Sequence, residues 1–501
     1  MLVLFVLLAA VLPAAAASAA TPPPVKHVFV VVLENKDQAK TFAADSPAPY
    51  LAHTLRQRGQ YLPNYFGVTH FSLGNYIAMV SGQGSNPQTQ ADCQFFTDFA
   101  PGVIGPDGQA MGQGCVYPSS VKTVADQLDE RGLGWKGYME DMGNDPGREP
   151  ATCGHPALNT QDKTQTAKKG DQYAARHNPF VYFHSIIDRP ACAANDVPLT
   201  RLEGDLAANR VGAFTFITPN LCHDGHDTPC VDGEPGGLKS PDAFLRTLIP
   251  KITASRAYHD GGLIVVTFDE SEKGAEACCN EPQFPNTANN GGTTTGRGGG
   301  QVGAVILSSF VKPGSVNPTP YNHFALLRSV EDIFGLPHLG YAARADLKAF
   351  GSDVYNAPVV VASCRDRTRP TLRYALGGIR GSSRTIDLRG TAADDGCAGS
   401  VAAHTVARRG AVRSVRFAVS AFTPGGCRFV GVDGRLTPTR SCRRPLFLTA
   451  RGTGRWQLRV RGRFPHGRYV VRSRVYDAAG NIGRPAPRTF RIARVRPRFA
   501  G

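Results

Sequence analysis

Four apolar runs in the first two thirds of this chain are hydrophobic at consecutive positions, and they constrain its fold more than any other feature. They cover residues 28–33, 213–217, 263–268 and 302–307. Continuous runs of this length are typical of strands that are buried on both faces, as in a parallel sheet between helices. The runs therefore predict a buried, largely parallel sheet.

Segments with a helical pattern and recognisable ends lie between these runs. We expect one helix at residues 121–131, which begins after Ser119 or Ser120 and ends at Gly132. We expect a second at residues 243–252, which begins at Ser240-Pro241, and a third at residues 323–334, which begins after Asn322 and ends at Gly335. Serine and asparagine cap helix N-termini, proline fits the first turn, and glycine ends helices. Alternating strands and helices predict an α/β domain over residues 21–363, with helices flanking the sheet.

After residue 364 the pattern changes to short alternating segments separated by turn residues. Residues 385–388, 412–419, 456–460 and 469–475 have the alternation of strands, which predicts an all-β sandwich domain over residues 364–501. The sequence from Tyr476 to Asn481 resembles the closing hairpin of bacterial immunoglobulin-like or fibronectin-like modules.

The net charge of +16 is distributed unevenly. Residues 365–501 hold 30 Arg and 6 Asp with no Lys or Glu, which gives +24, and the preceding 364 residues carry −8. Those 364 residues hold 13 Lys and 13 Arg, so the arginine bias belongs to one domain. Aromatic residues among the arginines are few and no nucleic-acid motif is evident, so we predict no nucleic-acid partner. We expect instead an anionic cell-surface polymer or lipid.

The start of the chain has the features of an export signal. Residues 2–12 are apolar, Pro13 follows, and residues 17–20 are small. A membrane anchor would need about 20 unbroken apolar residues, which Pro13 interrupts. We therefore predict a signal peptide at residues 1–20 and a secreted or cell-surface protein.

Twelve cysteines agree with an oxidising compartment. Spacing favours short-range pairs such as Cys222 with Cys230 and Cys427 with Cys442, and leaves the other pairings open. Because no CxxC pair occurs, a structural zinc site is not favoured.

Polar residues collect where the predicted strands end. Glu34-Asn35 follows the first strand, residues 219–227 follow the second and include His223, Asp224 and His226, and Asp269-Glu270 follows the third. Ligands bind beyond the carboxyl ends of strands in open α/β sheets. Carboxylates, amide oxygens and imidazoles bind divalent cations. We therefore predict one or two divalent metal ions, with Glu34, Asn35, Asp224, Asp269, Glu270 and His323 as candidate ligands.

Ser72 stands at the start of a predicted buried helix, residues 73–80. One interpretation is an ordinary helix cap. The other is a nucleophile at an anion-binding helix N-terminus, activated by nearby metal ligands. No Gly-x-Ser-x-Gly motif surrounds Ser72, so a hydrolase triad of that type is not supported.

The glycine-rich segment 271–300 follows the acidic end of the third strand and breaks the alternation of strands and helices. Loops of this length inside a compact domain are usually functional or disordered. A surface insertion and a lid over the site are both open interpretations.

Five ordered segments (27–35, 69–82, 219–227, 267–270 and 321–337) give residues 25–355 a resemblance to a family of secreted phosphoesterases. This family groups bacterial acid phosphatases with phospholipases C within the alkaline phosphatase superfamily. The resemblance implies an alkaline-phosphatase-like fold and the following roles: Glu34, Asp269 and Glu270 as metal ligands, Asn35 at metal or phosphate, Ser72 as nucleophile, Asn75 next to phosphate, and Asp224, His226 and His323 as ligands or phosphate contacts.

Departures from the family pattern favour phosphatase activity over phospholipase activity. Members of phospholipase character often carry Thr at the position of Ser72, and a His-Gly-Gly where this chain has Ser271-Glu272. Gly74 replaces the usual proline, which loosens the turn.

We therefore expect a phosphoester hydrolase that acts on phosphomonoesters through a phosphoserine, with His226 protonating the leaving group. Phospholipase C activity at a membrane surface is the alternative with the same site. A catalytically silent secreted binding protein is the alternative of another class, although Glu34, Ser72 and Asp269 are all retained.

Overall fold

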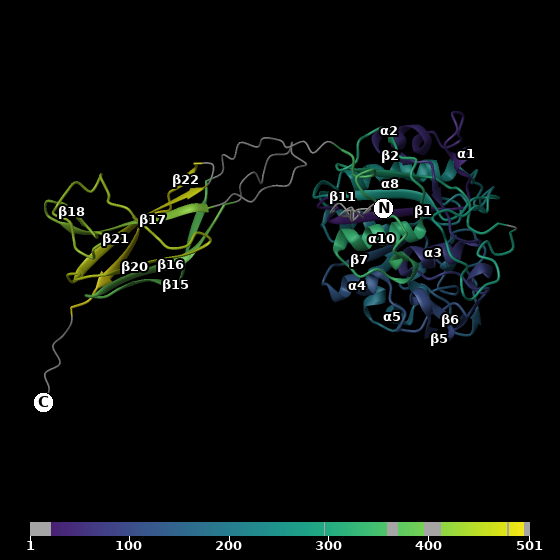
Figure 1. The fold of residues 1–501 in the computed structure, drawn as a ribbon, viewed down its shortest axis with the longest axis horizontal. Helices are drawn as coiled ribbons and strands as arrows, with labels where there is room; N and C mark the ends of the chain where they lie inside the picture. Colours follow the sequence, from purple (N-terminus) through teal and green to yellow (C-terminus); the bar gives the residue numbers. More distant parts are fainter. Residues whose placement is uncertain (1–21, 295, 358–368, 395–411, 478–479, 495–501) are drawn as a thin grey trace, which may run out of the picture. The chain divides into compact units, whose positions relative to one another are not determined.

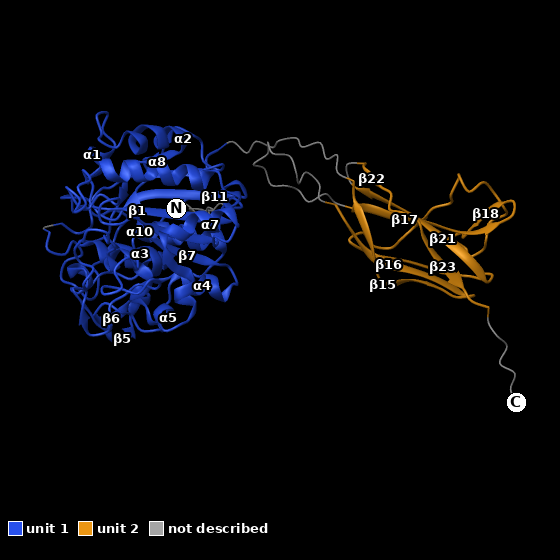
Figure 2. Cartoon of the chain, turned by 180° about the vertical axis from the view of Figure 1, so that it is seen from behind, with its two compact units in different colours: residues 1–359 blue, residues 360–501 orange. Residues whose placement is uncertain are grey.

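The computed structural model describes residues 22–294, 296–357, 369–394, 412–477 and 480–494, and the chain divides into two compact units, residues 1–359 and 360–501 (Figure 2). The expected signal peptide, the expected domain limit at residues 363–364, Cys364 and Cys397 lie outside the described residues. Within these ranges, no helix is both long and apolar enough to cross a membrane.

Unit 1 is built on an eight-stranded mixed sheet (Figure 1). Its strands, in spatial order, are β13 (Ser315–Val316), β2 (Gln60–Leu62), β12 (Ala304–Ser308), β11 (Gly262–Phe268), β1 (His27–Leu33), β10 (Phe214–Thr218), β7 (Trp135–Met139) and β9 (Asp196–Pro198). The five strands from β11 to β9 are parallel to one another. The four predicted strands are β1, β10, β11 and β12, and the largely parallel sheet is confirmed.

One predicted strand runs in the other direction. Residues 302–307 were expected among the parallel strands, but β12 pairs antiparallel with β11 and with β2. A parallel return needs a crossover connection, usually a helix. The structure has no helix in the described part of the segment between β11 and β12, and the chain turns back beside β11.

Helices cover both faces of this sheet: in Figure 1, α8 lies on one side of β1 and β11, and α3 and α10 lie on the other. The helices are α1 (Gln38–Thr41), α2 (Arg56–Arg58), α3 (Ser72–Ser81), α4 (Val124–Glu130), α5 (His184–Ile187), α6 (Ala191–Asn195), α7 (Leu202–Ala207), α8 (Lys239–Thr253), α9 (Arg256–His259) and α10 (His323–Phe334). Shorter turns are the π-helical η1 (Tyr50–Leu55) and the 3₁₀ segments η2 (Thr89–Ala91), η3 (Pro106–Gly108), η4 (Ala175–His177), η5 (Pro179–Tyr182), η6 (Leu199–Arg201) and η7 (Gly340–Ala343).

One predicted helix has the expected ends: Asn322 caps α10 by accepting from Ala325 N, and Gly335 ends it at φ 63°. The other two predicted helices begin at residues different from those expected. Helix α4 begins later than predicted, because Thr123 and the Asp126 side chain form a reciprocal capping box. Helix α8 begins at Lys239, so Ser240 lies inside its first turn and is not its cap.

Three small sheets complete unit 1. They pair β3 (Tyr65–Phe66) with β14 (Tyr321–Asn322), β4 (Phe95–Phe96) with β8 (Thr160–Gln161), and β5 (Ala100–Ile104) with β6 (Ala110–Gln113). The pairing of β3 with β14 matters for the site because it joins the segment before α3 to the start of α10.

Unit 2 consists of two sheets that share one hydrophobic core. The first contains β15 (Thr371–Gly381), β16 (Thr385–Ala393) and β20 (Arg455–Arg461). The second contains β18 (Gly426–Phe429), β17 (Val412–Thr423), β21 (Gly467–Asp477), β22 (Ile482–Gly483), β19 (Leu448–Thr449) and β23 (Arg488–Ile492). Buried side chains of β16 and β20 pack with those of β17 and β21. The four predicted strands are therefore present.

All ten cysteines in the described ranges form disulfides. The pairs Cys222–Cys230 and Cys427–Cys442 are confirmed. The other three are Cys93–Cys115, Cys153–Cys192 and Cys278–Cys279.

Candidate active site

Three carboxylates converge at the carboxyl ends of the central parallel strands. Glu34 follows β1, Asp269 follows β11, and Asp224 lies in the segment after β10; all three are fully buried. Main-chain hydrogen bonds fix them, since Glu34 N donates to Asp224 O at 2.8 Å and Asn35 N donates to Asp269 Oδ1 at 3.0 Å. The carboxyl ends of the parallel strands thus bring together residues that lie up to 235 positions apart in sequence.

Ser72 is the first residue of α3, and its hydroxyl does not cap that helix. Phe71 occupies the capping position without a side-chain cap, whereas Ser72 Oγ donates to Glu34 Oε2 at 2.8 Å. The Asp92 carboxylate accepts from Leu73 N at 3.0 Å and so partners the first turn of α3. The hydroxyl therefore belongs to the carboxylate cluster and stands at the positive end of a buried ten-residue helix.

Two further side chains hold Glu34. Asn35 Nδ2 donates to its Oε2 at 3.0 Å, and Tyr76 OH donates to its Oε1 at 2.6 Å. Tyr76 lies one turn after Ser72 on α3, so one helix face supplies two of these donors. Asn35 adopts φ 57°, which orients its amide toward Glu34.

His177, which no sequence pattern pointed to, lies between two of the carboxylates. Its Nδ1 lies 3.1 Å from Asp224 Oδ2, and its Nε2 lies 3.4 Å from Glu34 Oε1 without forming a hydrogen bond. The ring is 1% exposed and stacks on Tyr76. His177 comes from η4. In the sequence it follows no predicted strand and belongs to no helical pattern, so neither feature indicates a role for it.

The cluster fits a divalent cation on two observations. Glu34, His177 and Asp224 each offer a ligand atom, and these atoms lie within 4.8 Å of one another. His177 Nε2 and Asp269 Oδ2 are also buried without a hydrogen-bond partner. Buried polar atoms of native proteins normally have a hydrogen-bond partner, so the absence of one at these two atoms is consistent with a bound ligand. A mixed oxygen and imidazole donor set suits a transition-metal ion such as Zn²⁺ or Mn²⁺.

The electrostatics of the cluster support the same conclusion. Burial, and then the charges of Asp269 and Asp224, raise the pKa of Glu34 well above its ordinary value. Burial also raises the pKa of Asp224 and of Asp269, and it lowers the pKa of His177, which keeps that ring neutral. Three buried carboxylates this close together are unfavourable when ionised, although the charge of Arg176 acts on Asp224, and a divalent cation among them would stabilise their ionised forms.

Glu270 and Asn75 lie next to this cluster in a group of their own. Glu270 Oε2 lies 2.9 Å from His70 Nδ1 and accepts from Asn75 Nδ2 at 3.4 Å. Asn75 Oδ1 accepts from the backbone of residues 68 and 69, so it fixes the segment before α3. Although burial opposes its charge, the hydrogen bond and charge of Glu270 raise the pKa of His70 to about 9. Burial raises the pKa of Glu270 itself to about 8, and in this structure its side chain contacts His70 and Asn75.

His226 and a buried arginine lie at the edge of the site. His226 Nδ1 lies 2.7 Å from Asp227 Oδ1, and Arg176 Nη2 lies 3.4 Å from His226 Nε2. Arg176 is 3% exposed, and its Nε lies 3.8 Å from the Asp92 carboxylate that partners α3. Sequence reasoning missed Arg176, although it directly precedes His177. Arg176 thus places a buried positive charge near the Ser72 end of α3, and its Nη2 donates to His226.

His323 lies behind Asp269 rather than among the carboxylates. Its Nε2 donates to the main-chain oxygen of Asp269 at 2.5 Å, and Tyr65 OH donates to its Nδ1 at 3.2 Å. Burial lowers the pKa of His323 to about 4. Both ring nitrogens contact protein atoms, so in this structure the predicted ligand His323 lies behind the end of β11 and apart from the three carboxylates.

The glycine-rich segment packs on the strand-to-helix segment that presents Ser72. Gly274 O accepts from His70 Nε2 at 2.8 Å, Asn290 O accepts from Thr69 Oγ1 at 2.6 Å, and Gly299 N donates to Gly67 O. These contacts hold the segment against residues 67–70, next to Ser72.

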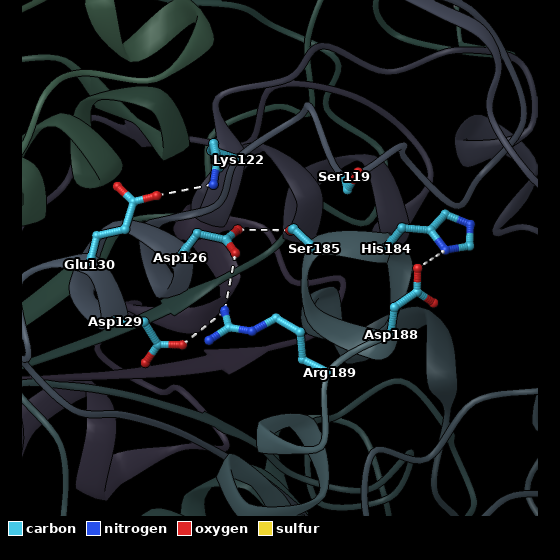
Figure 3. Close-up of a pocket in the computed structure, with 9 residues that line it drawn as sticks. All are labelled: Ser119, Lys122, Asp126, Asp129, Glu130, His184, Ser185, Asp188 and Arg189. Atoms are coloured by element: carbon cyan, nitrogen blue, oxygen red, sulfur yellow. Dashed lines mark hydrogen bonds and ion pairs between the residues drawn. The ribbon is translucent and has the colours of Figure 1, made fainter.

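A separate surface pocket of about 560 Å³ shares no residue with this cluster. It lies between α4 and α5, and both of its cations form ion pairs: Lys122 pairs with Glu130, and Arg189 pairs with Asp126 and Asp129 (Figure 3). Ion-paired surface side chains of this kind are ordinary solvated structure.

Comparison with known proteins agrees with this geometry. The chain is 27% identical to a probable acid phosphatase of Kluyveromyces lactis, over 63% of this chain and 59% of that protein. It is 25% identical to an acid phosphatase of Aspergillus fumigatus, over 62% and 55% of the two chains. It is 24% identical to a phosphatidylinositol-3-phosphatase of Mycobacterium tuberculosis, over 64% and 80%. The chain thus spans less than two thirds of the fungal relatives.

A solved protein of the alkaline phosphatase superfamily from Vibrio parahaemolyticus is also similar, with 12% identity, a TM-score of 0.39 and coverage of 75% of this chain and 78% of that one. Residues 46–337 match the profile of the Phosphoesterase family, and this stretch includes Ser72, His177, Asp224 and Asp269. The chain belongs to the Phosphoesterase family.

Proposed function

We propose that this protein is a divalent-metal-dependent hydrolase of phosphomonoesters that works through a phosphoserine at Ser72. The observation that carries the proposal is the hydrogen bond from Ser72 Oγ to Glu34, inside a buried donor set that fits a cation. Family membership and the relatives named acid phosphatase support phosphoester hydrolysis and favour monoesters over the phospholipase C alternative.

Separate residues of the chain would bind the metal ion and orient the nucleophile. Glu34, His177 and Asp224 would hold the metal ion, with Asp269 as a further ligand through Oδ2. The bound ion would supply positive charge that lowers the pKa of a hydroxyl and stabilises negative charge in the transition state. The Glu34 hydrogen bond orients the Ser72 hydroxyl, and the N-terminus of α3 favours the negative charge of the incoming phosphoryl group.

Transfer then proceeds in two steps. Ser72 Oγ passes its proton to Glu34 Oε2 and forms a bond to phosphorus as the bond to the leaving oxygen breaks. A water molecule later forms a bond to phosphorus, the Ser72–phosphorus bond breaks, and one proton returns to Ser72 Oγ as phosphate leaves. Arg176 would contact the equatorial phosphoryl oxygens, because arginine binds phosphate in two-point fashion. His226, whose side chain is 37% exposed, is the candidate proton donor to the leaving oxygen.

The remaining roles combine the sequence with side-chain contacts. We propose that Asn35 and Asn75, predicted as phosphate contacts, also hold Glu34 and the segment before α3 in place, and that Glu270, predicted as a metal ligand, supports the site through His70. We also propose segment 271–300 as a lid, with a surface insertion as the alternative. We also propose export by the predicted signal peptide, an immunoglobulin-like identity for unit 2, and an anionic cell-surface partner for that unit.

A panel of phosphomonoesters and phosphodiesters, assayed after chelation and readdition of single divalent ions, tests the proposal. We expect an aryl phosphomonoester to be hydrolysed only after metal readdition, and Ser72→Ala to abolish that turnover while retaining metal binding. Ser81→Ala, in the last turn of the same helix, is the matched control and should keep full activity. Metal-independent turnover, or a wild-type rate for Ser72→Ala, would contradict the proposal, and absence of turnover in the wild type with every ion would favour a silent binding protein.

A further inference from the structure

One face of the three-stranded sheet in unit 2 carries a field of arginines. The strand register places Arg455, Arg459 and Arg461 of β20 on the same face as Arg389 of β16, and opposite pairs extend this face to Arg373 and Arg380 of β15. Alternate residues of β20, Trp456, Leu458 and Val460, point into the core instead. The field is therefore a consequence of strand alternation.

These six arginines are exposed and form no ion pair in the part of the chain that the structure describes. Asp387 is the one acidic residue among the paired outer positions, and its Oδ1 already accepts from Gln457 Nε2 at 2.8 Å. Clustered like charges repel one another and are unfavourable unless an external anion compensates them. The field thus has uncompensated charge available to a partner.

Several arginines on the other sheet make contacts inside the unit. Arg416 lies over the Tyr476 ring, Arg474 lies over the Phe447 ring, and Arg472 donates to Cys442 O. These contacts stabilise unit 2 itself. Within the field, Arg380 Nε also donates to Gly377 O at 3.1 Å, so the field is defined by the shared, exposed face of its six arginines.

The spacing of the field suits an extended chain of anions. Successive outer positions lie about 7 Å apart along a strand, and neighbouring strands lie about 5 Å apart. A linear anion lying along β20 would meet Arg455, Arg459 and Arg461 in turn, with Arg389 alongside. Guanidinium groups bind phosphate oxygens in two-point fashion.

We propose that this face, defined by Arg373, Arg380, Arg389, Arg455, Arg459 and Arg461, binds a linear polymer whose repeating charges are phosphates. The inference specifies the anionic partner named in the proposed function, but it does not depend on catalysis by unit 1. The other residues at the paired outer positions of β16 and β20 are Thr385, Asp387, Thr391 and Gln457, which are polar. A membrane site would add apolar side chains for insertion, and a single-stranded nucleic-acid site would add aromatic ones.

The test measures binding of the full chain to long-chain inorganic polyphosphate at increasing NaCl concentrations. The triple variant Arg389→Gln, Arg455→Gln and Arg459→Gln should bind at least tenfold more weakly at low salt. The slope of the logarithm of its binding constant against the logarithm of the salt concentration should be less negative by about 2, since three phosphate contacts are lost. The matched control, Arg435→Gln, Arg443→Gln and Arg444→Gln, removes the same charge from exposed positions outside the field and should change affinity less than threefold.

Equal losses in both triple variants would overturn the proposal, because binding would then follow net charge. Tighter binding to phosphatidylglycerol vesicles or to DNA than to polyphosphate, lost in the field variant, would also overturn it. If the triple variant does not fold, Arg459→Gln alone should weaken polyphosphate binding about threefold, and an unchanged affinity would count against the field. Phosphatase turnover of a soluble aryl phosphate should be the same in all these variants, which separates failure of this proposal from failure of the catalytic one.

Discussion

Ser72 and Glu34 are joined by a 2.8 Å hydrogen bond although one begins a helix and the other directly follows the central strand β1. The serine donates, so its oxygen lone pairs remain available for a cation or for phosphorus. This contact distinguishes a reactive hydroxyl from a capping hydroxyl, because a cap would accept from the backbone of its own helix.

His177 should prove essential for metal binding. His177→Ala removes a neutral nitrogen ligand from between Glu34 and Asp224. We expect affinity for Zn²⁺ or Mn²⁺, measured by isothermal titration calorimetry on the chelated protein, to fall at least about tenfold. His184→Ala is the control, since His184 pairs with Asp98 and Asp188 near the surface pocket. Equal metal affinity in both variants would remove His177 from the ligand set.

Arg176 should contribute to transition-state stabilisation. Arg176→Gln should lower kcat/KM for an aryl phosphate about 10- to 100-fold, corresponding to roughly 1.4–2.7 kcal/mol, and weaken inhibition by inorganic phosphate. Arg176→Lys should recover part of the loss, because the charge returns without the two-point geometry. Arg189→Gln, in the surface pocket, should leave both constants unchanged. Normal phosphate inhibition in Arg176→Gln would show that this guanidinium does not touch the phosphoryl group.

Glu331 predicts a pH dependence of stability. Burial raises the pKa of Glu331 to about 9, while an unfolded glutamate titrates near 4.3. Between these values the folded state binds one proton more than the unfolded state, so the free energy of unfolding falls as pH rises from about 5 to 9.

Glu331→Gln removes this titration while keeping an acceptor for Leu339 N. Its free energy of unfolding should therefore fall less steeply with pH, by up to about 1.4 kcal/mol per unit. Denaturant titrations of both proteins at pH 5, 7 and 9 measure the difference. Parallel pH profiles would show that Glu331 is ionised in the folded protein.

The sequence was sufficient for the parts of the site that follow strand ends. Glu34, Asp224 and Asp269 could be predicted because continuous apolar runs mark buried strands, and the chemistry of parallel sheets lies at their carboxyl ends. Tyr76 was not among the predicted site residues. It could have been predicted, because it stands four residues after Ser72 on the same helix face.

Other parts of the site had no local signal. His177 and Arg176 come from a 3₁₀ turn, where position depends on tertiary packing alone. The direction of β12 likewise depends on the path of segment 271–300, which hydrophobic periodicity does not encode. In unit 2, by contrast, alternation in β20 determines both its core residues and its arginine face.

The central claim is that Ser72 carries the phosphoryl group during turnover. Rapid acid quenching of the metal-loaded enzyme with an aryl phosphate, followed by peptide mass spectrometry, tests it most directly. We predict that the peptide containing Ser72 gains the mass of one phosphoryl group, and that Ser72→Ala shows no modified peptide and no turnover. A phosphoryl group on another residue, or Ser72→Ala turning over substrate at the wild-type rate, would contradict the account.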